Sequence, residues 1–95
     1  MKIAIYYQKS ENEIAEMAIN HINELIQLLE THHTVKGVFI DRYNESIELM
    51  ELLNSPLSEI DYIYINKPIE NDFDRALIQQ LLRTEHFKIK YFNEI

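Results

Sequence analysis

The sequence predicts one α/β domain, residues 1–95, built as a three-layer αβα arrangement around a mainly parallel four-stranded sheet. Strand-like runs of β-branched and aromatic residues alternate with amphipathic helical segments in the order βαβαβαβ, which is typical of parallel sheets covered by helices on both faces. The chain is also short, with one Gly and two Pro among 95 residues, so it has room for one core and shows no linker.

The first half of the chain is expected to hold two strands and one long helix. Residues 2–7 (KIAIYY) are nearly all apolar, as expected for a central strand that is buried on both faces. Residues 11–31 predict a helix because apolar side chains recur with the helical period. These side chains are Ile14, Ala18, Ile22, Leu25 and Leu29. Residues 35–41 (VKGVFID) are more mixed in polarity, which indicates a strand at the sheet edge.

The second half is expected to add two helices and two strands. Residues 45–55 (ESIELMELLNS) predict a helix of about two turns. Residues 61–67 (DYIYINK) are aromatic and β-branched, so they are assigned to the third strand. A third helix is predicted to start at Asp72 or Asp74, because leucines and an isoleucine then form one stripe. Residues 87–92 (FKIKYF) alternate in polarity and predict a closing edge strand.

A strand order of 2-1-3-4 makes the first and third strands neighbours, with a topological switch point between their carboxyl ends. Ligands of doubly wound folds bind in the crevice at such a point. The residues predicted to line this crevice are Gln8, Lys9, Asp41, Arg42, Asn66 and Lys67. Ser10 follows at once and is the candidate nucleophile.

Composition excludes several functions. Nine Lys and Arg against 16 Asp and Glu give a formal net charge of -7, which disfavours binding of DNA or an anionic membrane by this domain alone. The chain has no Cys, so thiolate chemistry and disulfides are excluded. The apolar run from Ile3 to Tyr7 is too short for a signal peptide or a membrane span, which makes the cytoplasm the default location.

The sequence predicts neither a cofactor nor a metal site. A nucleotide site needs a glycine-rich turn, and the single glycine, Gly37, lies on the wrong side of the second strand. A phosphate-accepting receiver domain needs carboxylates where this chain has Gln8, Lys9 and Asn66. The four histidines lack the spacing of metal ligands. They are His21, His32, His33 and His86.

Ser10 allows two interpretations. A nucleophilic serine needs a base and donors for the developing negative charge, and no base is evident beside it. The stretch from Ser10 to Glu13 also matches the S-x-x-E capping box, in which the serine caps a helix and the glutamate reaches back. The local sequence favours the helix cap.

The opening MKIAIYYQKS resembles that of the serine recombinases, the resolvase and invertase family, whose first strand runs into Tyr-Ala-Arg-Val-Ser. Tyr6 matches the family tyrosine, Ser10 falls on the nucleophilic serine, and Gln8 replaces the arginine between them. The likeness continues with a strand ending in Asp41, a helix ending in the pair Leu52–Leu53, and the segments DYIYINK and FKIKYFNE. The resemblance implies DNA cleavage by the serine hydroxyl, with arginines neutralising the scissile phosphate.

The chain departs from the family where that chemistry is performed. Gln8 carries no charge, and residues 67–72 (KPIEND) stand where the family has Arg-Leu-Ser-Arg. The Ser-Gly loop after Asp41 is missing, and the chain ends after the fourth strand, before the family's dimer helix and DNA-binding domain. Each lost contact to the phosphate is expected to cost about 3 kcal/mol. These departures predict loss of catalysis.

The expected function is therefore a stand-alone serine-recombinase-like domain, catalytically inactive, that acts as a protein-interaction or regulatory module. The alternative is an enzyme in which Ser10 still cleaves DNA, with Lys9, Lys67 or Arg42 as substitute cations. A third idea is that an acidic face imitates nucleic acid, provided that its carboxylates share one surface. These are Glu11, Glu13, Glu16, Glu30, Glu48 and Glu51. The partner is not identified by the sequence, and a weak homodimer is left open.

Overall fold

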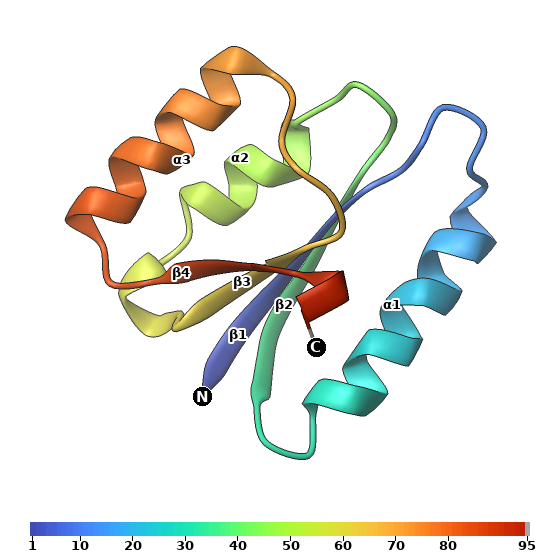
Figure 1. Cartoon of the computed structure of the whole chain (residues 1–95), viewed down its shortest axis with the longest axis horizontal. Coiled ribbons are helices and arrows are strands. Elements are labelled where there is room, and N and C mark those ends of the chain that lie inside the picture. The colour runs from blue at the N-terminus through green and yellow to red at the C-terminus, as the bar shows by residue number, and fades with distance from the viewer. Residues whose placement is uncertain (95) are drawn as a thin grey trace.

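The computed structural model describes residues 1–94. The strands are β1 Lys2–Gln8, β2 Thr34–Asp41, β3 Tyr62–Ile65 and β4 Lys88–Tyr91. The helices are α1 Ala15–Leu29, α2 Ile47–Leu53 and α3 Asp72–Thr84, with short 3-10 turns at Leu57–Glu59 and Phe92–Glu94. All four strands are parallel, in the order β2-β1-β3-β4, with α1 on one face of the sheet and α2 and α3 on the other (Figure 1). The predicted class, layers and strand order are confirmed.

Strand β1 lies at the centre of the sheet because its side chains are apolar on both faces. Every side chain from Ile3 to Tyr7 is buried. Alternation along the strand sends Ile3, Ile5 and Tyr7 toward α1, and Ala4 and Tyr6 toward α2 and α3. The two adjacent tyrosines therefore reach opposite sides of the sheet, and each contributes to a different part of the candidate site.

Strands β2 and β4 form the two edges, as predicted from their mixed polarity. The pairing of β1 with β2 shifts between Ile3 and Ala4, where Gly37 rather than Lys36 faces Ala4. The ring of Phe39 lies over Gly37, and a Cβ placed on this glycine would come within 2.9 Å of Phe39 Cε1. Gly37 thus serves close packing along β2 and has no role in a phosphate-binding turn.

The helix boundaries differ from the predictions at one place that matters for the site. Helix α1 begins at Ala15, four residues later than the predicted start, and its N-cap is Ile14 with no side-chain cap. Helix α3 begins at Asp72, and its N-cap Asn71 accepts from the amide of Asp74 at 3.0 Å. The segment between β1 and α1 is therefore a loop that carries Ser10.

The proposed acidic face does not exist as a single surface. Glu48 and Glu51 belong to α2, whereas the other four glutamates lie on or next to α1. These helices cover opposite faces of the sheet (Figure 1), so the condition set for a nucleic-acid mimic fails.

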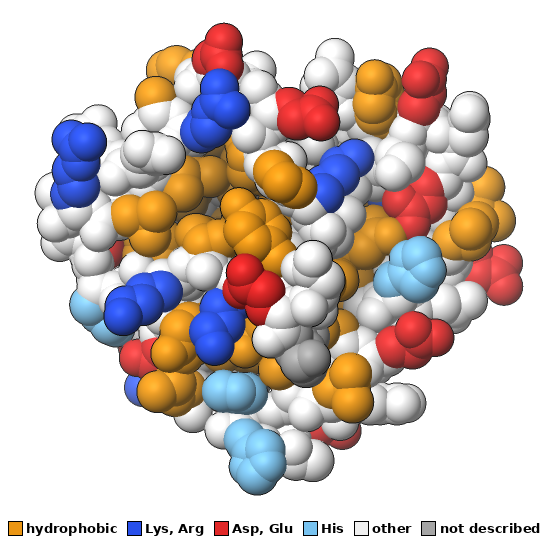
Figure 2. Space-filling model, in the orientation of Figure 1, with side chains coloured by type: hydrophobic (Ala, Val, Ile, Leu, Met, Phe, Trp, Pro, Cys, Tyr) orange, Lys and Arg blue, Asp and Glu red, His pale blue; other side chains and the backbone are white. Residues whose placement is uncertain are grey.

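Side chains at the surface are not evenly distributed. In the orientation of Figure 1, apolar side chains gather near the centre of the visible face, with Lys and Arg side chains around them (Figure 2). Among residues 1–94, no helix has the length and apolar character needed to cross a membrane.

Candidate functional site

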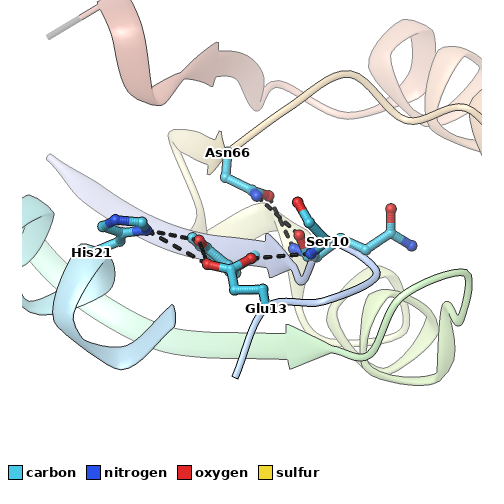
Figure 3. A network of polar contacts seen from close by, with 6 residues as sticks. Ser10, Glu13, His21 and Asn66 are labelled. Atoms are coloured by element: carbon cyan, nitrogen blue, oxygen red, sulfur yellow. Dashed lines mark hydrogen bonds and ion pairs between the residues drawn. The ribbon is translucent and has the colours of Figure 1, made fainter. Parts of the chain in front are cut away.

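Asn66 joins the carboxyl ends of β1 and β3, where the sequence places a crevice. Its Oδ1 accepts from the Gln8 amide at 2.9 Å, and its Nδ2 donates to the Gln8 carbonyl at 3.0 Å (Figure 3). The side chain thereby continues the ladder of hydrogen bonds beyond the last residue of β3, Ile65. The ends of β1 and β3 are joined in this way, and one hollow lies on each side of the sheet near them.

Asp41, predicted as a crevice residue, lines neither hollow and serves as a structural group. The side chain is buried, and its carboxylate accepts three hydrogen bonds: from Tyr6 OH at 2.7 Å and from the amides of Glu48 and Leu49 at 2.8 and 3.0 Å. Those amides belong to the first turn of α2, whose N-cap Ser46 provides no side-chain cap. Asp41 therefore caps α2 from the end of β2 and has little capacity left for a ligand.

The same arrangement fixes the hydroxyl of Tyr6. Burial raises the pKa of Tyr6 most, followed by the hydrogen bond to Asp41 and by the negative charges of Asp41 and Asp74. The hydroxyl consequently stays protonated and acts as a donor to Asp41. Tyr6, which matches the family tyrosine in the resemblance, is held in the core here.

A small polar pocket of about 70 Å³ lies on the side of α2 and α3. Tyr6, Gln8, Lys67 and Asp74 are among its lining residues. Asp74 is only 5% exposed, and in the described part of the chain no hydrogen bond reaches its carboxylate. Gln8 Nε2 donates to the carbonyl of Glu45 at 2.9 Å, so the side chain at the place of the family arginine is tied to the loop before α2.

Ser10 lies in an open depression on the side of α1. Glu13, His21 and Asn66 also line this depression. The carboxylate of Glu13 accepts from the Ser10 amide at 3.0 Å, and the Glu13 amide donates to the Ser10 carbonyl at 3.0 Å (Figure 3). The glutamate half of the predicted capping box is thus present, but Ser10 closes a turn and does not cap α1. No hydrogen bond of its hydroxyl exists within residues 1–94.

Glu13 also belongs to a network with Tyr7 and His21. The Tyr7 hydroxyl donates to Glu13 and lies 2.9 Å from His21 Nδ1, while Glu13 Oε2 lies 3.6 Å from that same nitrogen (Figure 3). Partial burial raises the pKa of Glu13, but the hydrogen bonds from Tyr7 and Ser10 and the nearby positive charges outweigh it and lower the pKa. Burial, then the hydrogen bond and charge of Glu13, raise the pKa of Tyr7. Glu13 is therefore ionised beside Ser10, and Tyr7 is protonated.

The predicted cations are distributed around the site without converging on Ser10. The Lys9 amide donates to the Asp41 carbonyl at 2.9 Å, and Arg42 is exposed in the turn that precedes α2. Lys67 lines the pocket on the other side of the sheet from Ser10, although its charge still contributes to lowering the pKa of Glu13. None of the three forms an ion pair within residues 1–94. In the same part of the chain, no group of three or more His, Cys, Asp or Glu is placed to hold a metal ion.

Three features of the site were not predicted from the sequence. They are the pair of hydrogen bonds from the Asn66 side chain to the Gln8 backbone (the Asn66 clasp), the capping of α2 by Asp41, and the network of Tyr7, Glu13 and His21. Asn66 and Gln8 are both predicted to lie at the crevice, so their contact could have been predicted from a strand order that makes β1 and β3 neighbours. The other two depend on loop paths, for which the sequence holds no comparable signal.

The arrangement offers no nucleophile paired with a base. Within residues 1–94 the Ser10 hydroxyl has no hydrogen-bond partner. Of the two candidate bases near it, the Glu13 carboxylate accepts from the Ser10 amide and the Tyr7 hydroxyl, and His21 contacts Tyr7 and Glu13. Comparisons of the chain with family models, with curated proteins and with solved structures found no match.

Proposed function

We propose that this chain is a serine-recombinase-like domain that does not cleave DNA and that acts as a protein-interaction or regulatory module. The observation that carries the proposal is the carboxylate of Glu13, hydrogen-bonded to the Ser10 amide at 3.0 Å. The resemblance places the scissile phosphate beside Ser10, so a negative charge stands where a catalytic site needs a positive one.

The negative charge of Glu13 beside Ser10 is unfavourable for cleavage of a phosphodiester. Phosphoryl transfer is catalysed mainly by positioning and by cations that neutralise the phosphate oxygens. The lowered pKa of Glu13 keeps it ionised at neutral pH, so it repels a phosphodiester. Gln8, which replaces the family arginine, is neutral and donates to Glu45. Loss of each donor to the transition state costs about 3 kcal/mol, and several such losses would leave no useful rate.

Binding of a protein partner is supported by the surface. The charge of -7 disfavours nucleic acid as a partner of the domain alone. Several large apolar side chains stay exposed in the described chain, including Phe73 at 72% and Ile47 at 64%. Single exposed apolar side chains are ordinary on a protein surface, but the apolar side chains that gather near the centre of the face in Figure 2 form the kind of patch that partner proteins cover.

The catalytic part of the proposal is tested with Ser10→Ala. Wild-type protein and the variant are incubated with supercoiled plasmid, and intact-protein mass spectrometry is used to search for a phosphoserine adduct. An active serine recombinase with its own site on the plasmid serves as the positive control. We expect no adduct and no relaxed plasmid with either protein. An adduct that forms on wild type and disappears in Ser10→Ala would establish the alternative, a DNA-cleaving enzyme.

The interaction part is tested by affinity capture from the native host after brief cross-linking, with an unrelated domain of similar size and charge as the control. We expect a defined protein to be enriched by wild type and by Ser10→Ala alike. Absence of any enriched protein would contradict an interaction role.

A further inference from the structure

The edge strand β4 presents backbone groups that the sheet leaves unpaired. Within residues 1–94 its one neighbouring strand is β3, and the Lys88 amide donates to the Asp61 carbonyl at 3.0 Å. In a parallel ladder alternate residues face the same neighbour, so the peptide groups of Ile89 and Tyr91 point away from β3. The Tyr91 amide already donates there to the carboxylate of Glu94 (Oε2, 3.2 Å), so a segment that pairs with this amide has to displace Glu94. The outer edge of β4 is therefore able to bind acceptor groups.

An apolar groove runs beside this edge. It lies between α3 and β4, has a volume of about 220 Å³, and opens near the centre of the face seen in Figure 2. Its apolar lining includes Ile65, Ile69, Ile78, Leu82, Ile89 and Tyr91. Ile89 and Tyr91 thus present side chains to the groove and backbone groups to the edge. An extended segment laid along β4 would reach both at once.

Charge on this part of the molecule differs from that of the whole. Residues 1–66 hold 4 Lys and Arg against 11 Asp and Glu, whereas residues 67–95 hold 5 of each, so the entire net charge of -7 belongs to the first part. Lys88 and Lys90 alternate with the groove residues along β4, and within residues 1–94 neither forms an ion pair. Lys90 Nζ instead lies 4.8 Å from the centre of the Tyr62 ring.

The charges of Lys88 and Lys90 favour one kind of segment at the β4 edge over another. If β4 paired with β4 of a second copy, the lysines of both chains would come close together, and like charges across a strand pair are destabilising. An acidic segment would instead gain favourable contacts. On the basis of the interaction role proposed above, we propose that β4 binds an extended segment of another protein in which apolar and acidic residues alternate, adding it to the sheet as a further strand.

The proposal is tested with a capped synthetic peptide of alternating Glu and Val or Ile, EVEIEVEI, titrated into ¹⁵N-labelled protein at 50 mM salt. We expect the largest shifts in the amide signals of β4, and binding that weakens with added salt. A peptide with Lys in place of Glu should not bind. Absence of binding at 1 mM peptide (about the weakest affinity worth assigning), or shifts confined to other surfaces, would overturn the proposal.

Three variants make the test specific. The double variant Lys88→Glu with Lys90→Glu should bind the acidic peptide about tenfold more weakly, whereas Lys36→Glu, on the opposite edge strand, should bind like wild type. Ile89→Pro removes an outward amide without removing a hydrogen bond to β3, so the fold should survive and peptide binding should be lost. Equal binding by wild type and the double variant would contradict the proposal.

The remaining outcomes separate this proposal from the function on which it rests. A wild-type protein that sediments as a dimer and becomes monomeric in Ile89→Pro would show that β4 serves a second copy, and would overturn the proposal. Capture of the same host protein by wild type and by the lysine double variant would place the interaction elsewhere, while the general interaction role would stand.

Discussion

Replacement of Asp41 by Asn tests whether this carboxylate holds the fold together or is free for a ligand. The side chain is 3% exposed and accepts from Tyr6 OH and from two amides of α2. A hydrogen bond to a buried charge contributes about 1.5 to 3 kcal/mol, and a helix cap about 1 kcal/mol. Asn retains one acceptor oxygen, so we expect Asp41→Asn to cost about 3 kcal/mol. A domain of this size has about 5 to 14 kcal/mol in total.

Urea unfolding followed by circular dichroism measures this loss. The midpoint should fall without a change in the denaturant dependence, because the surface exposed on unfolding is the same. Tyr6→Phe should cost about 1.5 kcal/mol, and the double variant should cost about 1 kcal/mol less than the sum, because the two side chains share one hydrogen bond. Asp72→Asn, which alters an exposed ion pair, is the matched control and should change stability by less than about 0.5 kcal/mol. A loss below 0.5 kcal/mol for Asp41→Asn, or strict additivity in the double variant, would refute the structural role.

Three further predictions concern other parts of the fold. Asn66→Ala should cost about 1 to 2 kcal/mol and speed hydrogen exchange of the β1 end, because both bonds of the clasp are lost; unchanged exchange would contradict it. Gly37→Ala should cost about 1 kcal/mol in urea unfolding because the new methyl meets the Phe39 ring, and an added Phe39→Leu should remove most of that cost; full additivity would argue against this contact. The pKa of His33 is lowered by burial and by the charges of the N-terminal amine, His32 and Lys90. The unfolded chain therefore binds a proton more readily than the folded one, so the free energy of unfolding should fall as the pH drops from 6.5, the ordinary histidine pKa, toward the lower pKa of His33 in the folded state. The slope in that pH window should flatten in His33→Gln and persist in His32→Gln.

Much of the fold was predictable because the spacing of apolar residues along the chain indicates which side chains are buried. The apolar run of β1 identified the central strand, and the mixed polarity of β2 and β4 placed them at the edges. The predicted start of α1 is wrong because the S-x-x-E pattern predicts a helix cap at Ser10, whereas the helix begins at Ala15. The glutamate half of that pattern also forms in a turn, where Glu13 binds the Ser10 amide before the helix begins.

The candidate site was predicted less well, since it depends on contacts between distant residues. Gln8 and Asn66 were placed at neighbouring strand ends, and they do touch. Asp41 was placed at the same crevice, yet its carboxylate turns under the first turn of α2. The path of residues 42–46 decides this, and no periodic pattern describes a loop of that length.

The sequence by itself determined the alternation of strands and helices, the layers, the acidic charge and the absence of an arginine at position 8. It left the strand order as an expectation, which the structure confirms. Those properties follow from the charge and polarity of the side chains and from the spacing of apolar and polar residues along the chain. Only the tertiary structure decided that Ser10 closes a turn ahead of α1, that the Asp41 carboxylate caps α2, and that β4 leaves one edge open beside an apolar groove. These are contacts across loops and between layers, and their energies depend on distance and burial rather than on sequence spacing.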